Sequence, residues 1–208
     1  MENNSNDSMS SMRKDVLSEI GNIGFGNAAT AMSSILGSRL SIDFTHVLAL
    51  DFDAVMDLLG GPETLAVGVL SLFEGDLNGM LLFILGKEQA DKIVSQLLKT
   101  TDDMSKYEYS HIQASAMKET ANIIGSSYLA ALESFTGLHL KLLPPQICVD
   151  MSGAILSVPV IEFGQTGDKA FLVKSSFDGG ELDIKGHLLM VSSADSYDKM
   201  FNVLGIEA

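Results

Sequence analysis

The chain has 208 residues, of which 46% are hydrophobic and 19% are charged, and its formal net charge is −14. This length and composition predict a globular protein with a sizeable core. The excess of acidic residues argues against a nucleic-acid groove and against binding to an anionic membrane, since both need basic patches.

Three further features indicate a cytoplasmic protein. Cys148 is the single cysteine, so an internal disulfide is impossible and a reducing compartment is expected. The polar N-terminus lacks the basic and apolar regions of a signal peptide, and no apolar run approaches the ~20 residues that a membrane span needs. We therefore predict a cytoplasmic location without membrane insertion.

Helical and strand patterns alternate along the first half of the chain. Residues 1–9 are mostly polar, which predicts a disordered tail. Residues 10–36 carry apolar side chains at helical spacing, and Gly37 ends this long helix. The elements predicted after it are a strand at 40–50, a short helix at 53–60, paired strands at 66–73 and 78–85, and an amphipathic helix at 87–99.

The same order recurs after a polar connector at residues 100–108. A second long helix is predicted over residues 109–135, and Gly137 ends it. The elements predicted after this helix are an extended segment at 138–151, strands at 153–163, 170–177 and 181–192, and a closing helix at 194–205.

Identical residues at corresponding positions indicate an internal duplication. When residue 15 is aligned with residue 115, the identical pairs are Glu19/Glu119, Asn22/Asn122, Ile23/Ile123, Ala31/Ala131, Ser34/Ser134, Gly37/Gly137 and Leu40/Leu140. Later matches are GMLLFI at 79–84 with GHLLMV at 186–191, and ADKIV at 90–94 with YDKMF at 197–201.

These matches predict a single domain over residues 10–208, built of two repeats at about 10–100 and 109–205. A helix followed by strands, repeated twice, predicts an α+β sandwich with a pseudo-two-fold axis.

Each long helix carries a polar stripe opposite its apolar residues. Residues three, four or seven apart lie on nearly the same face of a helix. The solvated face of an amphipathic helix would look the same, but two stripes at identical spacing in a diverged duplication indicate a shared function. The stripes consist of Asp15, Glu19 and Asn22 in the first helix, and of Ser115, Glu119 and Asn122 in the second.

Small residues interrupt the same two helices. Gly21, Gly24 and Gly26 lie inside the first, although glycine costs roughly 1 kcal/mol relative to alanine in a helix interior. Small side chains allow close approach of another backbone, which belongs either to a neighbouring helix of this molecule or to a docking partner.

The second stripe completes a longer pattern. Ser115, Glu119, Asn122 and Pro145 reproduce the motif Asp/Ser-x3-Glu-x2-Asn-x22-Pro of the CheC, CheX and FliY phosphatases of bacterial chemotaxis. The first stripe reproduces the helical part, but Thr45 stands where the motif has proline. The segment FGNAATAMS, the turn GDLNG and the two-copy layout complete a resemblance to the CheC family over nearly the whole chain.

This resemblance implies a fold and a substrate. The fold would be a two-layer sandwich with one continuous, mostly antiparallel sheet and two long motif helices side by side on the surface. The substrate would be CheY carrying an aspartyl phosphate, which makes the chain a hydrolase. No cofactor or metal site of its own is expected, because CheY would supply its own Mg²⁺.

The resemblance also implies roles for the stripe residues. In the family the motif glutamate pairs with a lysine of the partner, and an asparagine amide, which both donates and accepts hydrogen bonds, can hold the attacking water. These roles carry over to Asn22 and Asn122 and to Glu19 and Glu119. Supporting positions are Asp15, Ser115 and Pro145.

Other interpretations remain open. CheC-like proteins also bind CheD, a receptor glutamine deamidase, so the chain could be mainly an adaptor for CheD with little phosphatase activity. Asp150 is an outward acid near an expected sheet edge and a weak candidate for partner contact. The four histidines show no zinc-ligand spacing, and Cys148 is expected to be a small strand residue.

Overall fold

The computed structural model describes residues 11–37, 41–49, 57, 59–100, 104, 107–164, 171–178 and 184–206. The tail predicted at residues 1–9 lies outside these ranges, as do most of the short helix predicted at 53–60 and much of the connector at 100–108.

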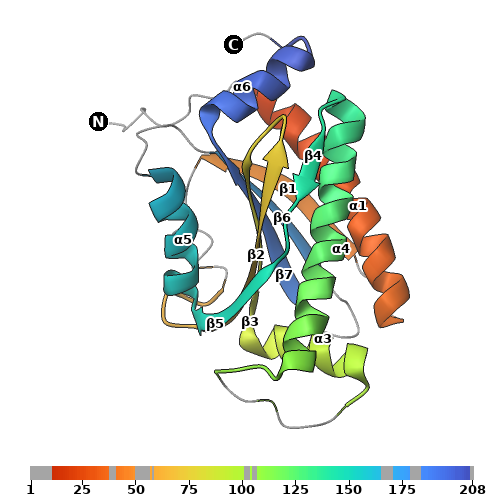
Figure 1. The fold of residues 1–208 in the computed structure, drawn as a ribbon, viewed down its shortest axis with the longest axis vertical. Coiled ribbons are helices and arrows are strands. Elements are labelled where there is room, and N and C mark those ends of the chain that lie inside the picture. Colours follow the sequence, from red (N-terminus) through yellow and green to blue (C-terminus); the bar gives the residue numbers. More distant parts are fainter. Residues whose placement is uncertain are drawn as a thin grey trace.

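One antiparallel sheet forms the centre of the molecule (Figure 1). Its order is β1-β6-β7-β3-β2-β4, and β5 also pairs with β2. The strands run in the ranges Ser41–Ala49 (β1), Leu65–Gly75 (β2), Gly79–Gly86 (β3), Leu140–Leu142 (β4), Gln146–Met151 (β5), Phe171–Asp178 (β6) and Lys185–Ser192 (β7). Each strand pair is antiparallel, so the expected continuous antiparallel sheet is confirmed.

Five helices are seen among the described residues, and two of them dominate one face of the sheet. α1 (Ser11–Leu36) and α4 (His111–Thr136) lie side by side there (Figure 1). α3 (Lys87–Leu98) lies at one end of this pair and α6 (Ala194–Val203) at the other. None of the described helices is both long and apolar enough to cross a membrane.

The segment predicted as a strand at 153–163 is instead the helix α5 (Ser152–Gly164), which contains Pro159. That prediction was wrong because an apolar run has no periodicity that separates a buried strand from a buried helix. Ile155 and Leu156 of α5 are buried against the face of the sheet opposite α1 and α4 (Figure 1). The expected two layers are therefore three in this part of the fold.

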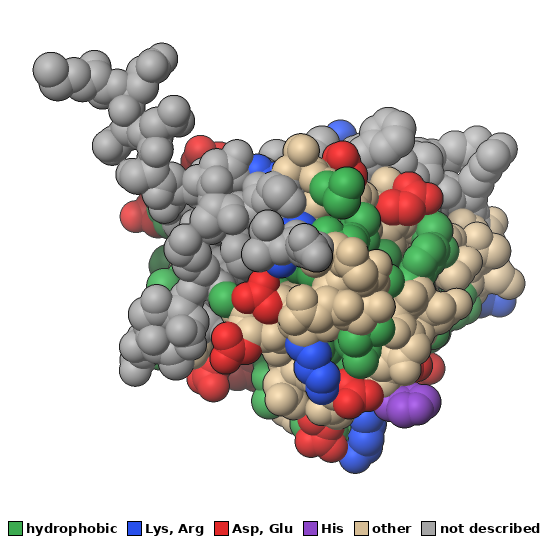
Figure 2. Space-filling view, turned by 90° about the horizontal axis from the view of Figure 1, so that it is seen from above, with side chains coloured by type: hydrophobic (Ala, Val, Ile, Leu, Met, Phe, Trp, Pro, Cys, Tyr) green, Lys and Arg blue, Asp and Glu red, His purple; other side chains and the backbone are tan. Residues whose placement is uncertain are grey.

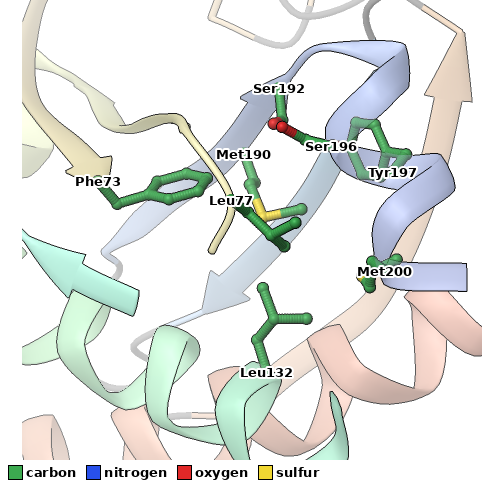
Figure 3. A pocket seen from close by; sticks show the side chains of 8 residues that line it. All are labelled: Phe73, Leu77, Leu132, Met190, Ser192, Ser196, Tyr197 and Met200. Carbon is green, nitrogen blue, oxygen red and sulfur yellow. The ribbon is translucent and has the colours of Figure 1, made fainter. Parts of the chain in front are cut away.

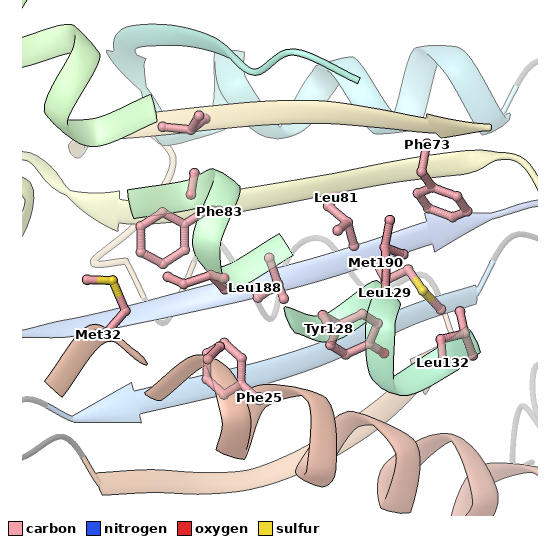
Figure 4. Packing of buried hydrophobic residues seen from close by; sticks show 14 of the residues in the cluster. Phe25, Met32, Phe73, Leu81, Phe83, Tyr128, Leu129, Leu132, Leu188 and Met190 are labelled. Carbon is pink, nitrogen blue, oxygen red and sulfur yellow. The ribbon is translucent and has the colours of Figure 1, made fainter. Parts of the chain in front are cut away.

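The core has two parts because alternate residues of a strand face opposite sides of the sheet. Leu81 and Phe83 of β3 pack toward α1 and α4 (Figure 4), whereas Leu82 and Ile84 pack toward α5. Burial on both faces explains why the central strands read as unbroken apolar runs.

Close packing of α1, α4 and the sheet accounts for two of the helix glycines. A Cβ atom on Gly24 would lie 2.9 Å from the Cα atom of Tyr128, and one on Gly125 would lie 3.1 Å from the side chain of Leu142. Internal packing is thereby confirmed as the reason for the small residues at these two positions.

The GDLNG turn joins β2 and β3 and ties them to the chain after α4. Gly75 has φ 133°, and a Cβ atom there would collide with the carbonyl oxygen of His139. The backbone N–H of Asp76 donates to that same carbonyl at 2.9 Å, and the His139 N–H donates to the Asp76 carboxylate at 2.9 Å. These contacts hold the turn against the segment that follows α4, so the GDLNG motif has a structural role.

Candidate functional site

The two polar stripes lie on the outer faces of α1 and α4. Glu19 and Glu119 are exposed, and Asn22 and Asn122 are half-buried. Positions 11–22 each have the same burial class as the position 100 residues later. Neither asparagine is enclosed in the core, so both amides lie at a surface that another protein could reach.

The stripe on α4 is open to a partner. Within the part of the chain that the structure describes, no hydrogen bond or ion pair engages the side chains of Glu119 and Asn122. Ser115, one turn earlier, is exposed, and so is its counterpart Asp15 on α1. The site is a ridge on a helix, which suits contact with a protein surface better than enclosure of a small molecule.

The first turn of α1 is tied to α6. The Arg13 guanidinium donates to Asp198 at 2.9 Å and lies 4.6 Å from the centre of the Phe201 ring. The Arg13 side chain is 12% exposed and that of Asp198 is 56% exposed. This contact fixes the end of α1 that carries Asp15 and Glu19.

The start of α4 is tied to α3 by a more buried group. Lys87 donates to both carboxylate oxygens of Asp91, at 2.6 and 2.7 Å, and the Tyr109 hydroxyl donates to Asp91 at 2.6 Å. The Lys87 side chain is 7% exposed and that of Asp91 is 29% exposed. Burial, and then the bond to Asp91, raises the pKa of Tyr109 well above its usual range.

Asp91 and Asp198 are therefore positioning residues that sequence reasoning did not assign. The signal was present, because the matched segments ADKIV and YDKMF align these two aspartates. Their partners could not be found that way, since Arg13 and Tyr109 come from distant or unmatched parts of the chain.

Thr45 and Pro145 lie at equivalent irregularities of the sheet. Asp43 pairs with Ser176 and His46 with Lys174, so three steps along β1 match two along β6. In the second copy, Leu142 pairs with Phe73 and Gln146 with Leu70, so four steps match three along β2. Each of the two irregular segments therefore contains one residue more than the strand it pairs with. Only the second of these segments contains proline.

Comparisons with known proteins show the family of this chain. A model of the CheC-like family matches residues 12–43, which hold the first stripe and the start of β1. The CheY-P phosphatase CheC of Bacillus subtilis is 34% identical over 194 residues, covering 92% of this chain and 93% of that protein. The chain belongs to the CheC-like family.

Solved structures show the same fold at lower identity. The crystal structure of FliY from Thermotoga maritima matches with TM-score 0.69 and 22% identity, covering 95% of this chain and 98% of that one. A chain of the CheX-CheY-BeF3-Mg²⁺ complex from Borrelia burgdorferi matches with TM-score 0.51 and 16% identity, covering 82% of this chain and 96% of that one. The α+β fold of this CheC-like chain is thus shared across these proteins.

The weaker candidates of this CheC-like chain lie apart from the stripes. Asp150 is exposed on β5, which pairs only with β2 among the described strands, so its predicted position at a sheet edge is confirmed. Cys148 is in the same strand, and burial of its thiol raises its pKa. The described residues contain no cluster of three His, Cys, Asp or Glu side chains that could hold a metal ion.

A small cavity lies beneath α6, and no stripe residue lines it (Figure 3). Its walls are mainly apolar, and the hydroxyls of Ser192 and Ser196 both donate to the carbonyl of Asn78. Figure 2 looks onto this end of the molecule and shows acidic side chains dispersed among other types. Neither feature competes with the stripes as a functional site.

Proposed function

We propose that this chain is a phosphatase that hydrolyses the aspartyl phosphate of a CheY-type response regulator. The observation that carries the proposal is the Glu-x-x-Asn pair on the outer face of both α1 and α4. The identity to a protein named CheY-P phosphatase supports it. Each pair is a separate site on a rigid helix that packs on the sheet.

Asn22 and Asn122 would orient the attacking water. Phosphoryl transfer through a loose transition state needs a water held in line with the bond that breaks. An amide side chain both donates and accepts hydrogen bonds, so it can orient that water without removing its proton. Half-burial of both amides favours this role, because it limits the positions that each can adopt.

Glu19 and Glu119 would set the docking register. Each exposed carboxylate can accept a charge-assisted hydrogen bond from a lysine of the partner. Because an acyl phosphate is already activated, the phosphatase itself needs neither nucleophile nor metal. The Mg²⁺ would be that of the phosphorylated response regulator, as in the complex named for CheX, CheY, BeF3 and Mg²⁺.

The two sites would face opposite ends of the helix pair. The start of α1 contacts α6 through Arg13, whereas the start of α4 contacts α3 through Tyr109. Gln96 of α3 also donates to the carbonyl of Leu36, the last residue of α1, so the two helices run antiparallel. A pseudo-two-fold axis between them would relate the sites.

We infer that this symmetry comes from internal duplication. β3 and β7 are the two central strands, and Leu82 pairs with Leu189, its aligned counterpart. On either side, Met80 pairs with Val191 and Ile84 with His187, as a two-fold axis through the central pair requires.

The test is phosphate release from a phosphorylated CheY-type protein by the Asn22→Ala/Asn122→Ala variant. We expect a loss on the order of 10²-fold, the scale of misplacing a reacting group. Asn202→Ala, an exposed asparagine on α6, is the matched control and should keep the full rate. A double variant as fast as wild type would overturn the mechanism.

The adaptor role is separated by adding CheD to the same assay. As a phosphatase, the chain shortens the lifetime of the CheY phosphate whether or not CheD is present. A lifetime unchanged by the chain, alone or with CheD, would favour the adaptor for CheD.

A further inference from the structure

Each motif helix exposes one large apolar side chain in its first turn. Met12 is 62% exposed and Ile112 is 63% exposed. They precede Glu19 and Glu119 by seven residues, which is close to two helical turns, so each lies on the same face as the glutamate. The separation along the helix is about 10 Å.

These two side chains are presented by fixed backbone. The neighbour of Met12 is Arg13, which is held by Asp198 and Phe201. Ile112 follows the N-cap Ser110, whose side chain accepts a bond from the Gln113 backbone N–H in a capping box. An apolar side chain on an ordered turn offers binding area at a low entropic cost.

We propose that Met12 and Ile112 are the apolar contacts of the two docking surfaces for the phosphorylated response regulator. This inference rests on the proposed function and adds a specificity contact to it. Protein interfaces commonly surround an apolar contact with polar and charged groups, and here Asp15 or Ser115 lies between the apolar residue and the glutamate. The partner surface would carry an apolar depression about 10 Å from the lysine that meets the glutamate.

Charge favours this partner over a second copy of the chain. Two copies docking through the same stripe would place Glu19 and Asp15 against carboxylates of equal sign, which is unfavourable. A partner with lysine at its docking surface has the complementary charge.

The experiment isolates one site at a time. In an Asn22→Ala background, Ile112→Ser should raise the KM for the phosphorylated CheY-type protein on the order of tenfold and leave kcat nearly unchanged. Met12→Ser in an Asn122→Ala background should raise KM in the same way at the first site. Binding of the same protein activated with beryllofluoride and Mg²⁺ should weaken by a similar factor when both docking surfaces are changed, in Met12→Ser/Ile112→Ser.

Ile161→Ser is the matched control, because Ile161 is 55% exposed on α5, on the opposite face of the sheet. It should leave both KM and binding unchanged, and thermal melting should show that all variants fold equally well. Unchanged KM in Ile112→Ser and Met12→Ser and unchanged binding in Met12→Ser/Ile112→Ser, with an active parent, would overturn the inference alone. An altered oligomeric state would mark a self-association surface and also overturn it, whereas an inactive wild-type chain would instead contradict the proposed function.

Discussion

α1 and α4 expose the same pattern of residues but are held at their first turns by different chemistry. The start of α1 depends on an ion pair whose acid, Asp198, is 56% exposed. The start of α4 depends on Lys87, Asp91 and Tyr109, where the lysine side chain is 7% exposed, and on the capping box of Ser110. The two aspartates occupy aligned positions of the matched segments, yet their partners differ.

This difference shows which features the function would restrain. The polar stripe has the same spacing in both helices, while the groups that position the two helix starts differ. A positioning group only has to hold the helix start, and several side-chain combinations do that. The stripe has to match the surface of another protein.

The largest effect on stability is expected from the two aspartates that hold the helix starts, Asp91 for α4 and Asp198 for α1. Asp91→Asn removes the partner of a buried ammonium, so it should lower the free energy of unfolding by about 3 kcal/mol. Asp198→Asn removes an exposed partner and should cost less than about 1 kcal/mol. Urea denaturation of both variants measures the difference, and equal costs would show that the two aspartates are equivalent.

The next effect concerns the two asparagines taken singly. If the sites work independently, each single alanine variant keeps the activity of the other site. We expect Asn122→Ala to lose more than half of the phosphate-release rate and Asn22→Ala less than half, because only the second copy carries the full motif with Pro145. Steady-state rates of the two variants, measured side by side, check this, and the reverse order would contradict it.

A smaller, pH-dependent effect is expected at Asp76, which contacts the chain after α4 at His139 and also Lys199 of α6. The bond from the His139 backbone, and then the contact with Lys199, lower the pKa of Asp76. A lowered pKa means that the ionised group stabilises the fold above its unfolded pKa, and that this stabilisation is lost as the pH falls through the folded pKa. The melting temperature of Asp76→Asn should therefore lie below that of wild type at pH 7 and approach it at acidic pH.

The smallest effect is expected from Thr45→Pro, which restores the motif proline in the first copy. Residue 45 lies in the irregular part of β1, between the paired residues Asp43 and His46. Because the regular pairing of β1 with β6 is interrupted there, a proline at this position should change stability by less than about 1 kcal/mol. Thermal melting tests this, and a large destabilisation would show that β1 and the β4–β5 segment tolerate proline differently.

Local patterns predicted much of the fold and of the candidate site. The helical spacing of apolar residues located α1 and α4 to within two residues at each end. The position of Glu19 opposite that apolar face predicted its exposure, whereas Asn22 on the same stripe is half-buried. The alternation at Ile147, Cys148 and Val149 likewise predicted the outward direction of Asp150. Such patterns suffice because a residue's face depends only on its place in a regular element.

What depended on contacts between distant residues could not be predicted in this way. The apolar segment at 153–163 forms α5, which buries the face of the sheet opposite α1 and α4. No feature within the segment itself indicates that this face has to be buried by a helix. The same holds for the contact of Arg13 with Asp198, since these residues are 185 positions apart in the chain.

By itself, therefore, the sequence determined the two helices, their exposed stripes and the strands between them, because each follows from short-range periodicity. Only the tertiary structure decided that strands from the two halves of the chain pair with each other, β1 with β6 and β2 with β5, and that α1 and α4 run antiparallel. Those choices depend on how apolar surfaces from distant segments bury one another, and that is a property of the whole assembled chain.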